Sequence, residues 1–250
     1  MIRRTLRAEF FRQVRSPSLV ILLGVLLAAW CIALVGNIII SRGEVAPLFA
    51  GQTIQSLVAS LWPFLVLLHA AGSLAIDRES GVLAFWLVSP ISRQALYFSR
   101  AVASIIFLML SIVLIHSLTW IFVTVLSPNV LELNFDVFLS SSCVMAIVHF
   151  LVFLPLVSLG MFFSALGVRL SGTFACTIGS YFLLDLLSTI TTIREFIFTS
   201  YYRIPFDMFY DMTASFPVTW PSISSCLFLA TWIALPLFIG LSIFRSRDTF

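Results

Sequence analysis

The sequence predicts an all-α membrane protein, and three observations lead to that prediction. Hydrophobic residues make up 60% of the 250 residues, charged residues only 10%, and the mean hydropathy is +1.10. The apolar residues lie in long runs near the length of about 20 residues that a helix needs to cross a bilayer. The few charged residues gather mostly between these runs. This composition excludes a soluble domain in practice.

A basic leader precedes the first apolar run. Residues 1–16 hold five arginines, and Ile2, Leu6, Phe10 and Val14 recur at every fourth position. This spacing places the four apolar side chains along one side of a helix. We therefore expect an interfacial helix that rests on an anionic membrane surface.

Six apolar segments follow the leader, and we expect each of them to form a transmembrane helix. The first is longer than the apolar core of a signal peptide and lacks a small-residue cleavage site, so we expect it to be retained. Residues 194–222, before the last segment, are rich in aromatic residues and proline, which is typical of a loop in the aromatic belt. The expected spans are residues 19–40, 56–76, 101–126, 137–166, 173–193 and 223–244.

The distribution of arginine predicts the orientation of these spans. The chain has fourteen basic residues, and all of them are arginine. With the N-terminus inside, eleven fall on the cytoplasmic side, and only Arg42, Arg194 and Arg203 fall on the other. The loops are short enough for the positive-inside rule to apply, so we expect both termini in the cytoplasm.

The stretch between the second and third spans differs from an ordinary loop. It begins with three charged residues, 77–79, and continues with a wholly apolar run, 82–88, that is too short to cross a bilayer. Ser80 is positioned to cap a short helix and Pro90 to end it, and Ser92 is positioned to cap the next helix. The short helix either rests in the lipid headgroups or docks onto another protein.

Three short motifs lie in and after this stretch. They are Glu79-Ser80-Gly81-Val82-Leu83, then Ser89-Pro90-Ile91-Ser92-Arg93, then Ser99-Arg100 at the entry to an apolar run. Together they resemble the coupling-helix region of ABC-2 type transporter permeases. Two residues depart from that family's usual pattern, since Ala84 stands where many members have an acidic residue and Arg100 where lysine is common.

The resemblance implies that the short helix is cytoplasmic and contacts a separate ABC ATP-binding subunit. ATP and Mg would be bound by that partner, because a chain without lysine has no P-loop. The resemblance also implies a second permease subunit, identical or paralogous, a bacterial inner membrane, and re-entrant helices within 194–222. It assigns the ATPase contact to Glu79, Gly81, Leu83, Phe85, Trp86, Pro90 and Arg93.

No arrangement of residues predicts catalysis, a metal site or a cofactor held by this chain. The absence of lysine removes Schiff-base and Ser-Lys chemistry. The sequence has neither a Gly-x-Ser-Gly nucleophile motif nor the His-Glu-x-x-His motif of zinc proteases. The four cysteines fall singly in different apolar segments, which disfavours a disulfide or a metal cluster.

Two polar residues inside the expected spans are candidates for a substrate path. At 1.5 Å per residue, Asp185 lies about 18 Å from the cytoplasmic edge of its span, and His149 about 17 Å from the opposite edge of its own. The two side chains can meet if these helices are neighbours. A carboxylate at that depth is costly unless it faces water, pairs with another group or is protonated. Alternatively, Asp185 is a hydrogen-bonded residue that holds helices together, or it lies nearer the membrane interface.

These observations favour a permease subunit of an ATP-driven exporter that moves a hydrophobic or amphiphilic substrate. We expect membrane lipid to surround the chain, and nothing in the sequence points to a nucleic-acid partner. A membrane assembly or anchoring subunit, which binds a cytoplasmic partner without transport, is the main alternative. An intramembrane enzyme is a third. A neighbouring gene for an ABC ATPase would distinguish the first from the other two.

Overall fold

The computed structural model describes residues 17–40, 47–58, 61–88, 92–126, 135–213 and 221–246. Within these ranges all regular secondary structure is helical, which confirms the predicted all-α class. The interfacial leader expected at 1–16 lies outside them.

Several of the helices are long and apolar enough to cross a membrane. Four qualify singly within the described ranges, and a fifth span results if two consecutive helices joined by a bend of 43° are counted as one. The first expected span forms helix α2 (Pro17–Ile40), of which Val20–Gly36 counts only as a shorter apolar helix. The chain is therefore an all-α membrane protein, while the number of six spans stays a prediction.

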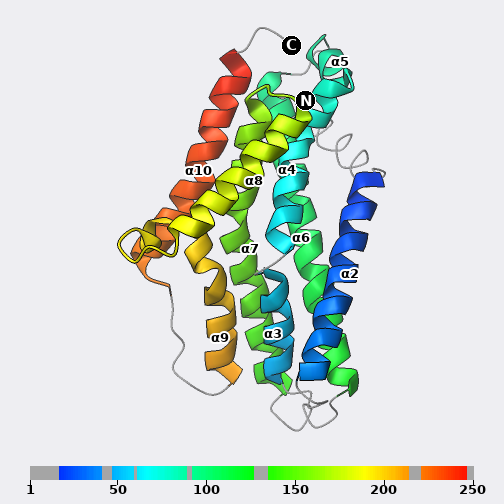
Figure 1. Ribbon diagram of the computed structural model, residues 1–250, viewed down its shortest axis with the longest axis vertical. Coiled ribbons are helices and arrows are strands. Elements are labelled where there is room, and N and C mark those ends of the chain that lie inside the picture. The colour runs from blue at the N-terminus through cyan, green and yellow to red at the C-terminus, as the bar shows by residue number, and fades with distance from the viewer. Residues whose placement is uncertain are drawn as a thin grey trace.

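Two long helices run from one end of the molecule to the other. Helix α6 (Arg93–Leu126) has 34 residues and α7 (Phe135–Ala165) has 31, which correspond to about 51 and 47 Å of helix. Both exceed the roughly 30 Å of a bilayer's hydrocarbon core. They run the length of the bundle in Figure 1, and α6 leaves one side uncovered. Helix α7 packs against α6 and against α4 (Trp62–Glu79), α8 (Leu170–Leu187), α9 (Ile204–Thr213) and α10 (Ile223–Ser246).

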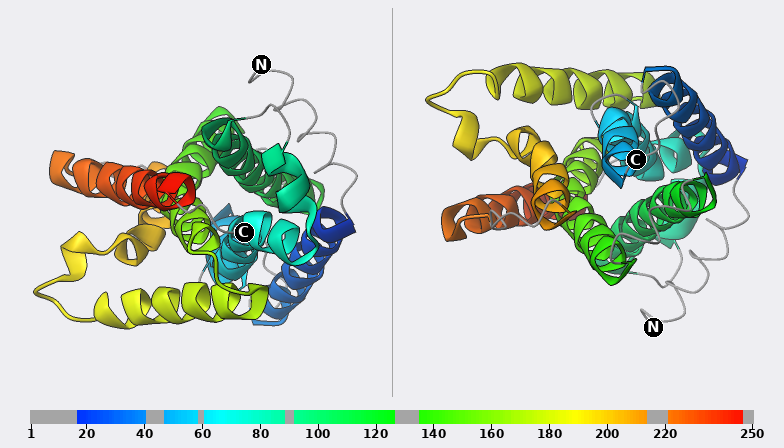
Figure 2. Two further views of the ribbon diagram at one scale, coloured as in Figure 1. Left: turned by 90° about the horizontal axis from the view of Figure 1, so that it is seen from above. Right: turned by 90° about the horizontal axis from the view of Figure 1, so that it is seen from below.

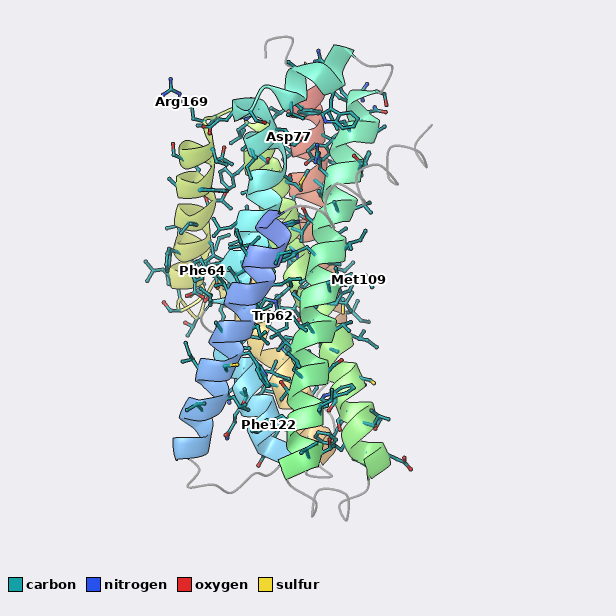
Figure 3. All side chains as sticks on the ribbon, turned by 90° about the vertical axis from the view of Figure 1, so that its right-hand side faces the viewer. Trp62, Phe64, Asp77, Met109, Phe122 and Arg169 are labelled. Carbon is teal, nitrogen blue, oxygen red and sulfur yellow. The ribbon has the colours of Figure 1, made fainter. Side chains whose placement is uncertain are left out.

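The second expected span, 56–76, is divided in the structure. Helix α3 (Pro47–Val58) ends within it, and α4 (Trp62–Glu79) begins after the bend. The physical reason is Pro63, which has no backbone N–H to donate and whose fixed φ suits the first turn of a helix rather than its interior. Trp62 begins α4 and lies about half way along the bundle (Figure 3).

Small residues let the helices approach closely. A Cβ atom added at Gly160 of α7 would come within 2.7 Å of Ala70 Cβ and 3.0 Å of Ala71 N, both in α4. Gly240 gives the same close approach to Phe162 Cα and Tyr97 from helix α10 (Ile223–Ser246). Small residues at helix contacts are the usual way for membrane helices to gain packing contacts.

The last part of the chain departs from the expected span 173–193. Helix α8 (Leu170–Leu187) ends earlier, and turns lead into the short 3-10 helices η2 (Arg194–Phe196) and η3 (Phe198–Arg203). Helix α9 (Ile204–Thr213) follows and packs against α7 and α3. Figure 2 shows α8 and α10 extending to one side of the bundle, with η2 and η3 near their far ends.

Two buried tryptophans attach α4 and α2 to α6. The indole N–H of Trp62 donates to Ser111 Oγ of α6 at 3.0 Å, and that of Trp30 of α2 donates to Thr119 Oγ1 of α6 at 2.9 Å. Each hydrogen bond satisfies a polar group that would otherwise be buried without a partner. The bundle around α6 is therefore held by specific polar contacts as well as by apolar packing.

Candidate coupling site

The charged triplet Asp77-Arg78-Glu79 ends α4 and precedes the short helix α5 (Val82–Val88). We call these three residues the charged root of α5. Asp77 forms a buried ion pair with Arg100, about two turns into α6. Both side chains lie in the interior, so the pair joins the two helices that flank α5. Figure 3 shows Asp77 at the end of the bundle that carries α5.

Arg78 attaches the root to the end of α7. Its guanidinium donates from Nη2 to the carbonyl oxygen of Ser164 at 3.0 Å and from Nη1 to that of Val168 at 3.1 Å. The last carbonyls of a helix have no partner within the helix and carry partial negative charge. Arg78 therefore caps the C-terminus of α7.

Glu79 attaches the root to the start of α8. Its Oε1 atom accepts a hydrogen bond from the backbone N–H of Leu170, the first residue of α8, at 2.8 Å. Arg169 precedes that helix without a side-chain capping bond of its own. A carboxylate at a helix N-terminus satisfies a free N–H and opposes the positive end of the helix dipole. Three consecutive residues thus contact three different helices.

The turn after the root depends on a glycine. Gly81 has a φ of +75°, a conformation in which a Cβ atom clashes with the backbone, and it leaves open space around the position of that atom. The hydroxyl of Ser80 donates to the carbonyl of Asp77. Ser80 therefore closes α4, which corrects the expectation that it caps the start of α5.

Helix α5 lies on the bundle through one side. Leu83 is 1% exposed and belongs to the hydrophobic core, and Trp86 is half-buried against that core. Val82 is 39% exposed and Ala84 is also exposed, so the described part of the outer side of the helix is small and apolar. The Phe85 side chain and Pro90 lie outside the described residues.

The start of α6 contacts the end of α10. Ser92 Oγ accepts from the backbone N–H of Ala95 at 3.2 Å, which confirms the predicted cap. Arg93 Nη1 donates to the carbonyl oxygen of Arg245 at 3.2 Å. Arg93 therefore acts as a C-terminal cap for α10, in the same way that Arg78 caps α7.

His149, one of the two substrate-path candidates, is sealed in the core. The centroid of its ring lies 5.3 Å from that of His116 in α6 and 6.0 Å from those of Trp62 and Phe153. Both histidines are at most 2% exposed and lie among aromatic side chains of the core. A neutral imidazole suits this position, because an isolated charge is costly inside a bilayer.

Asp185, the other candidate, is exposed in the last turn of α8. Among the described residues no hydrogen bond or ion pair joins it to His149, so the structure does not bring the two together. Its charge acts on the phenol of Tyr202, which lies beyond the end of α8. Burial, neighbouring Tyr181 and Asp185 together raise the pKa of Tyr202 in η3 well above its usual value.

Of the predicted contact residues, the structure gathers Glu79, Gly81, Leu83, Trp86 and Arg93 at one end of the bundle. Sequence reasoning missed the partners of the charged root, above all the pairing of Asp77 with Arg100. An acidic residue at the end of one apolar segment and an arginine within the next could have indicated it. In the described ranges no three His, Cys, Asp or Glu side chains are grouped as a metal site would require.

The contacts among the described residues join α4 to α6, α7 and α8, and α6 to α10, at the end of the bundle that carries α5. No known protein family and no curated protein matches this sequence.

Proposed function

We propose that this chain is the membrane-spanning permease subunit of an ATP-driven exporter of the ABC-2 type. The observation that carries the proposal is the anchoring of α5 by Asp77, Arg78 and Glu79, which contact α6, α7 and α8. A partner that binds α5 therefore acts through rigid polar contacts on three helices at once. Coupling between the partner's site and the substrate path needs a structural element whose equilibrium both of them can shift.

In this proposal a separate ATP-binding subunit holds ATP and Mg and moves α5. This movement of α5 shifts the equilibrium between two packings of the helices. Each packing exposes the substrate to a different side of the membrane. The contact surface is formed by the exposed side of α5 with Val82 and Ala84, bordered by Trp86 and Arg93. Leu83, Glu79 and Gly81 support this surface from the protein side. The Leu83 side chain is buried in the core, the Glu79 carboxylate is hydrogen-bonded to α8, and Gly81 forms the turn before α5.

The proposal includes six spans, cytoplasmic termini and the inner membrane of a bacterium, as the arginine distribution and the family resemblance imply. It also includes a second permease subunit. Phe182, Leu183 and Leu186 leave one side of α8 uncovered, and Asp185 lies among them. A second copy packed there would place Asp185 beside a hydrated substrate path, where its charge is tolerated. His149 is sealed from that path and serves packing.

The proposal predicts that an ABC ATP-binding subunit is encoded beside this chain, and co-purification with that subunit tests it. Val82→Glu places a charge on the exposed side of α5 and should abolish co-purification and lipid-stimulated ATPase activity. Val137→Glu is the matched control, since Val137 is similarly exposed, at 37%, in the first turn of α7 and makes no contact with the charged root. Equal retention of the partner by both variants would sink the proposed contact.

The same complex separates transport from anchoring. Asp185→Asn should leave assembly and ATP hydrolysis intact while lowering export of an amphiphilic dye from inverted vesicles. Asp207→Asn is its control, because Asp207 already pairs with Arg203 on an exposed helix turn. A wild-type complex that hydrolyses ATP but moves no amphiphile would favour the alternative, an assembly or anchoring subunit.

A further inference from the structure

A groove runs along the last turns of α10, and its described lining residues all lie on that helix. Phe238, Leu241, Ser242, Arg245 and Ser246 line its wall, and its volume is about 490 Å³. These positions recur at helical spacing and share one side of α10. The wall changes from apolar at Phe238, which is 65% exposed, to cationic at the end of the helix. The groove is open along its outer side rather than enclosed.

Gln94 of α6 fixes the cationic end of the groove in position. With its amide oxygen turned toward Arg245, Gln94 accepts from Nη1 at 2.9 Å and from Nε at 3.3 Å. No carboxylate of the described chain pairs with Arg245. A guanidinium has five N–H donors, so several remain for an anion after these two. The hydroxyls of Ser242 and Ser246 lie on the same wall.

The setting determines which anion fits. Leu235, Phe238 and Ile239 are exposed on a helix apolar enough to span a membrane, so lipid covers them. The guanidinium of Arg245 then lies where that helix leaves the hydrocarbon, at the level of the headgroups. A ligand that satisfies both ends of the groove is amphiphilic, with an acyl chain along Phe238 and a phosphate at Arg245.

We propose that this groove binds an anionic phospholipid, whose phosphate is held by Arg245 and by the hydroxyls of Ser242 and Ser246. Charge-assisted bonds to a guanidinium favour phosphate, and the acyl chain supplies apolar burial along the wall. Assignment to the cytoplasmic leaflet, where anionic lipids are concentrated, rests on the orientation in the proposed function. The groove itself and the class of its ligand do not depend on that orientation.

Lipid at this site also bridges two helices. Gln94 in the first turn of α6 orients Arg245, and Arg93 caps the helix end that carries it. A bound phosphate therefore stabilises the contact between the end of α10 and the start of α6. We expect the thermal midpoint of the purified chain to rise when phosphatidylglycerol is added, and to rise less with phosphatidylcholine.

Native mass spectrometry of the full chain with phosphatidylglycerol tests the proposal without any ATPase or transport assay. Arg245→Gln should lower retention of this lipid roughly tenfold, the loss expected for a charge-assisted hydrogen bond. Arg203→Gln, a matched change at an exposed arginine paired with Asp207, should leave retention unchanged. Ser242→Trp fills the groove without removing charge and should also lower retention, whereas Ser224→Trp on the exposed first turn of α10 should not.

Three results would overturn the proposal. The first is wild-type retention of phosphatidylglycerol by both Arg245→Gln and Ser242→Trp. The second is an equal loss in Arg203→Gln, which would mean that total charge rather than this groove holds the lipid. The third is displacement of the lipid by inorganic phosphate alone, which would assign the site to a soluble phosphate compound. Failure of the proposed transport function would leave all three readouts unaffected.

Discussion

At the scale of single residues, the buried pair of Asp77 and Arg100 is the most consequential contact of the candidate site. Two charges are taken out of water here, and their mutual attraction offsets the cost of burying them. The pair is therefore weak as a source of net stability but strongly dependent on both partners being present.

We expect Asp77→Leu and Arg100→Met to lower stability separately by about 3–5 kcal/mol, because each leaves one charge buried without its partner. The double variant should recover most of that loss. Thermal unfolding of the purified chain in detergent measures all three. Losses that simply add in the double variant would show that the two charges do not depend on each other.

At the scale of elements, α5 is part of the bundle as well as a surface for a partner. Leu83 contributes to the core while Val82, its neighbour in sequence, is exposed. Consecutive residues of a helix point in different directions, so a short apolar helix can use one side for packing and another for binding. The wholly apolar run 82–88 cannot reveal this division, because it has no polar side.

Leu83→Asp should destabilise the chain by itself, before any partner is present. A buried carboxylate without a partner is costly, and a loss of at least about 2 kcal/mol is expected. Val82→Asp, on the exposed side of the same helix, should change stability by less than about 0.5 kcal/mol. The thermal midpoints of the two variants, measured without the ATPase, check this prediction, and equal midpoints would contradict it.

The contact between α4 and α7 depends on the absence of a side chain at Gly160. Gly160→Ala should destabilise the bundle by about 1–3 kcal/mol, because the added methyl group overlaps Ala70 and the α4 backbone. Gly179→Ala in α8 is the control, since nothing lies within 4 Å of its Cβ position. There the same change should be neutral or stabilising, because alanine is the better helix former. Equal effects at the two sites would show that helix propensity, rather than packing, decides.

At the scale of the whole molecule, the structure places α5, the start of α6 and the end of α10 at one end of the bundle. The far end of α9 lies toward the other end (Figure 1). This arrangement is compatible with the eleven-to-three division of arginine, which predicts the first end to be cytoplasmic.

Reporter fusions test that orientation directly. Fusions at Arg93 and after Ser246 should show cytoplasmic activity, and a fusion after Thr213 should show external activity. Alkaline phosphatase, which is active only outside, and a fluorescent protein that folds only inside give opposite readouts for each site. An external result at Arg93 would reverse the orientation and with it the proposed contact between α5 and a cytoplasmic ATPase.

The sequence by itself determined the helical class, the approximate places of the apolar helices and the short helix after the second apolar segment. These follow from local properties, since hydropathy over about 20 residues and the placement of proline and capping serine act within one segment. The cap at Ser92 was predicted for this reason, and the structure confirms it. Even the division at Pro63 had a local cause that was visible in the sequence.

Only the tertiary structure decided which side chains meet. Asp77 and Arg100 are 23 positions apart, Arg78 and Ser164 are 86 apart, and the packing of α4, α6 and α7 brings each pair into contact. The same packing seals His149 beside His116 and leaves Asp185 exposed, although both looked alike as polar residues in apolar runs. Pairing of this kind depends on how helices are rotated about their axes, and a membrane helix that is apolar on every side carries little information about that rotation.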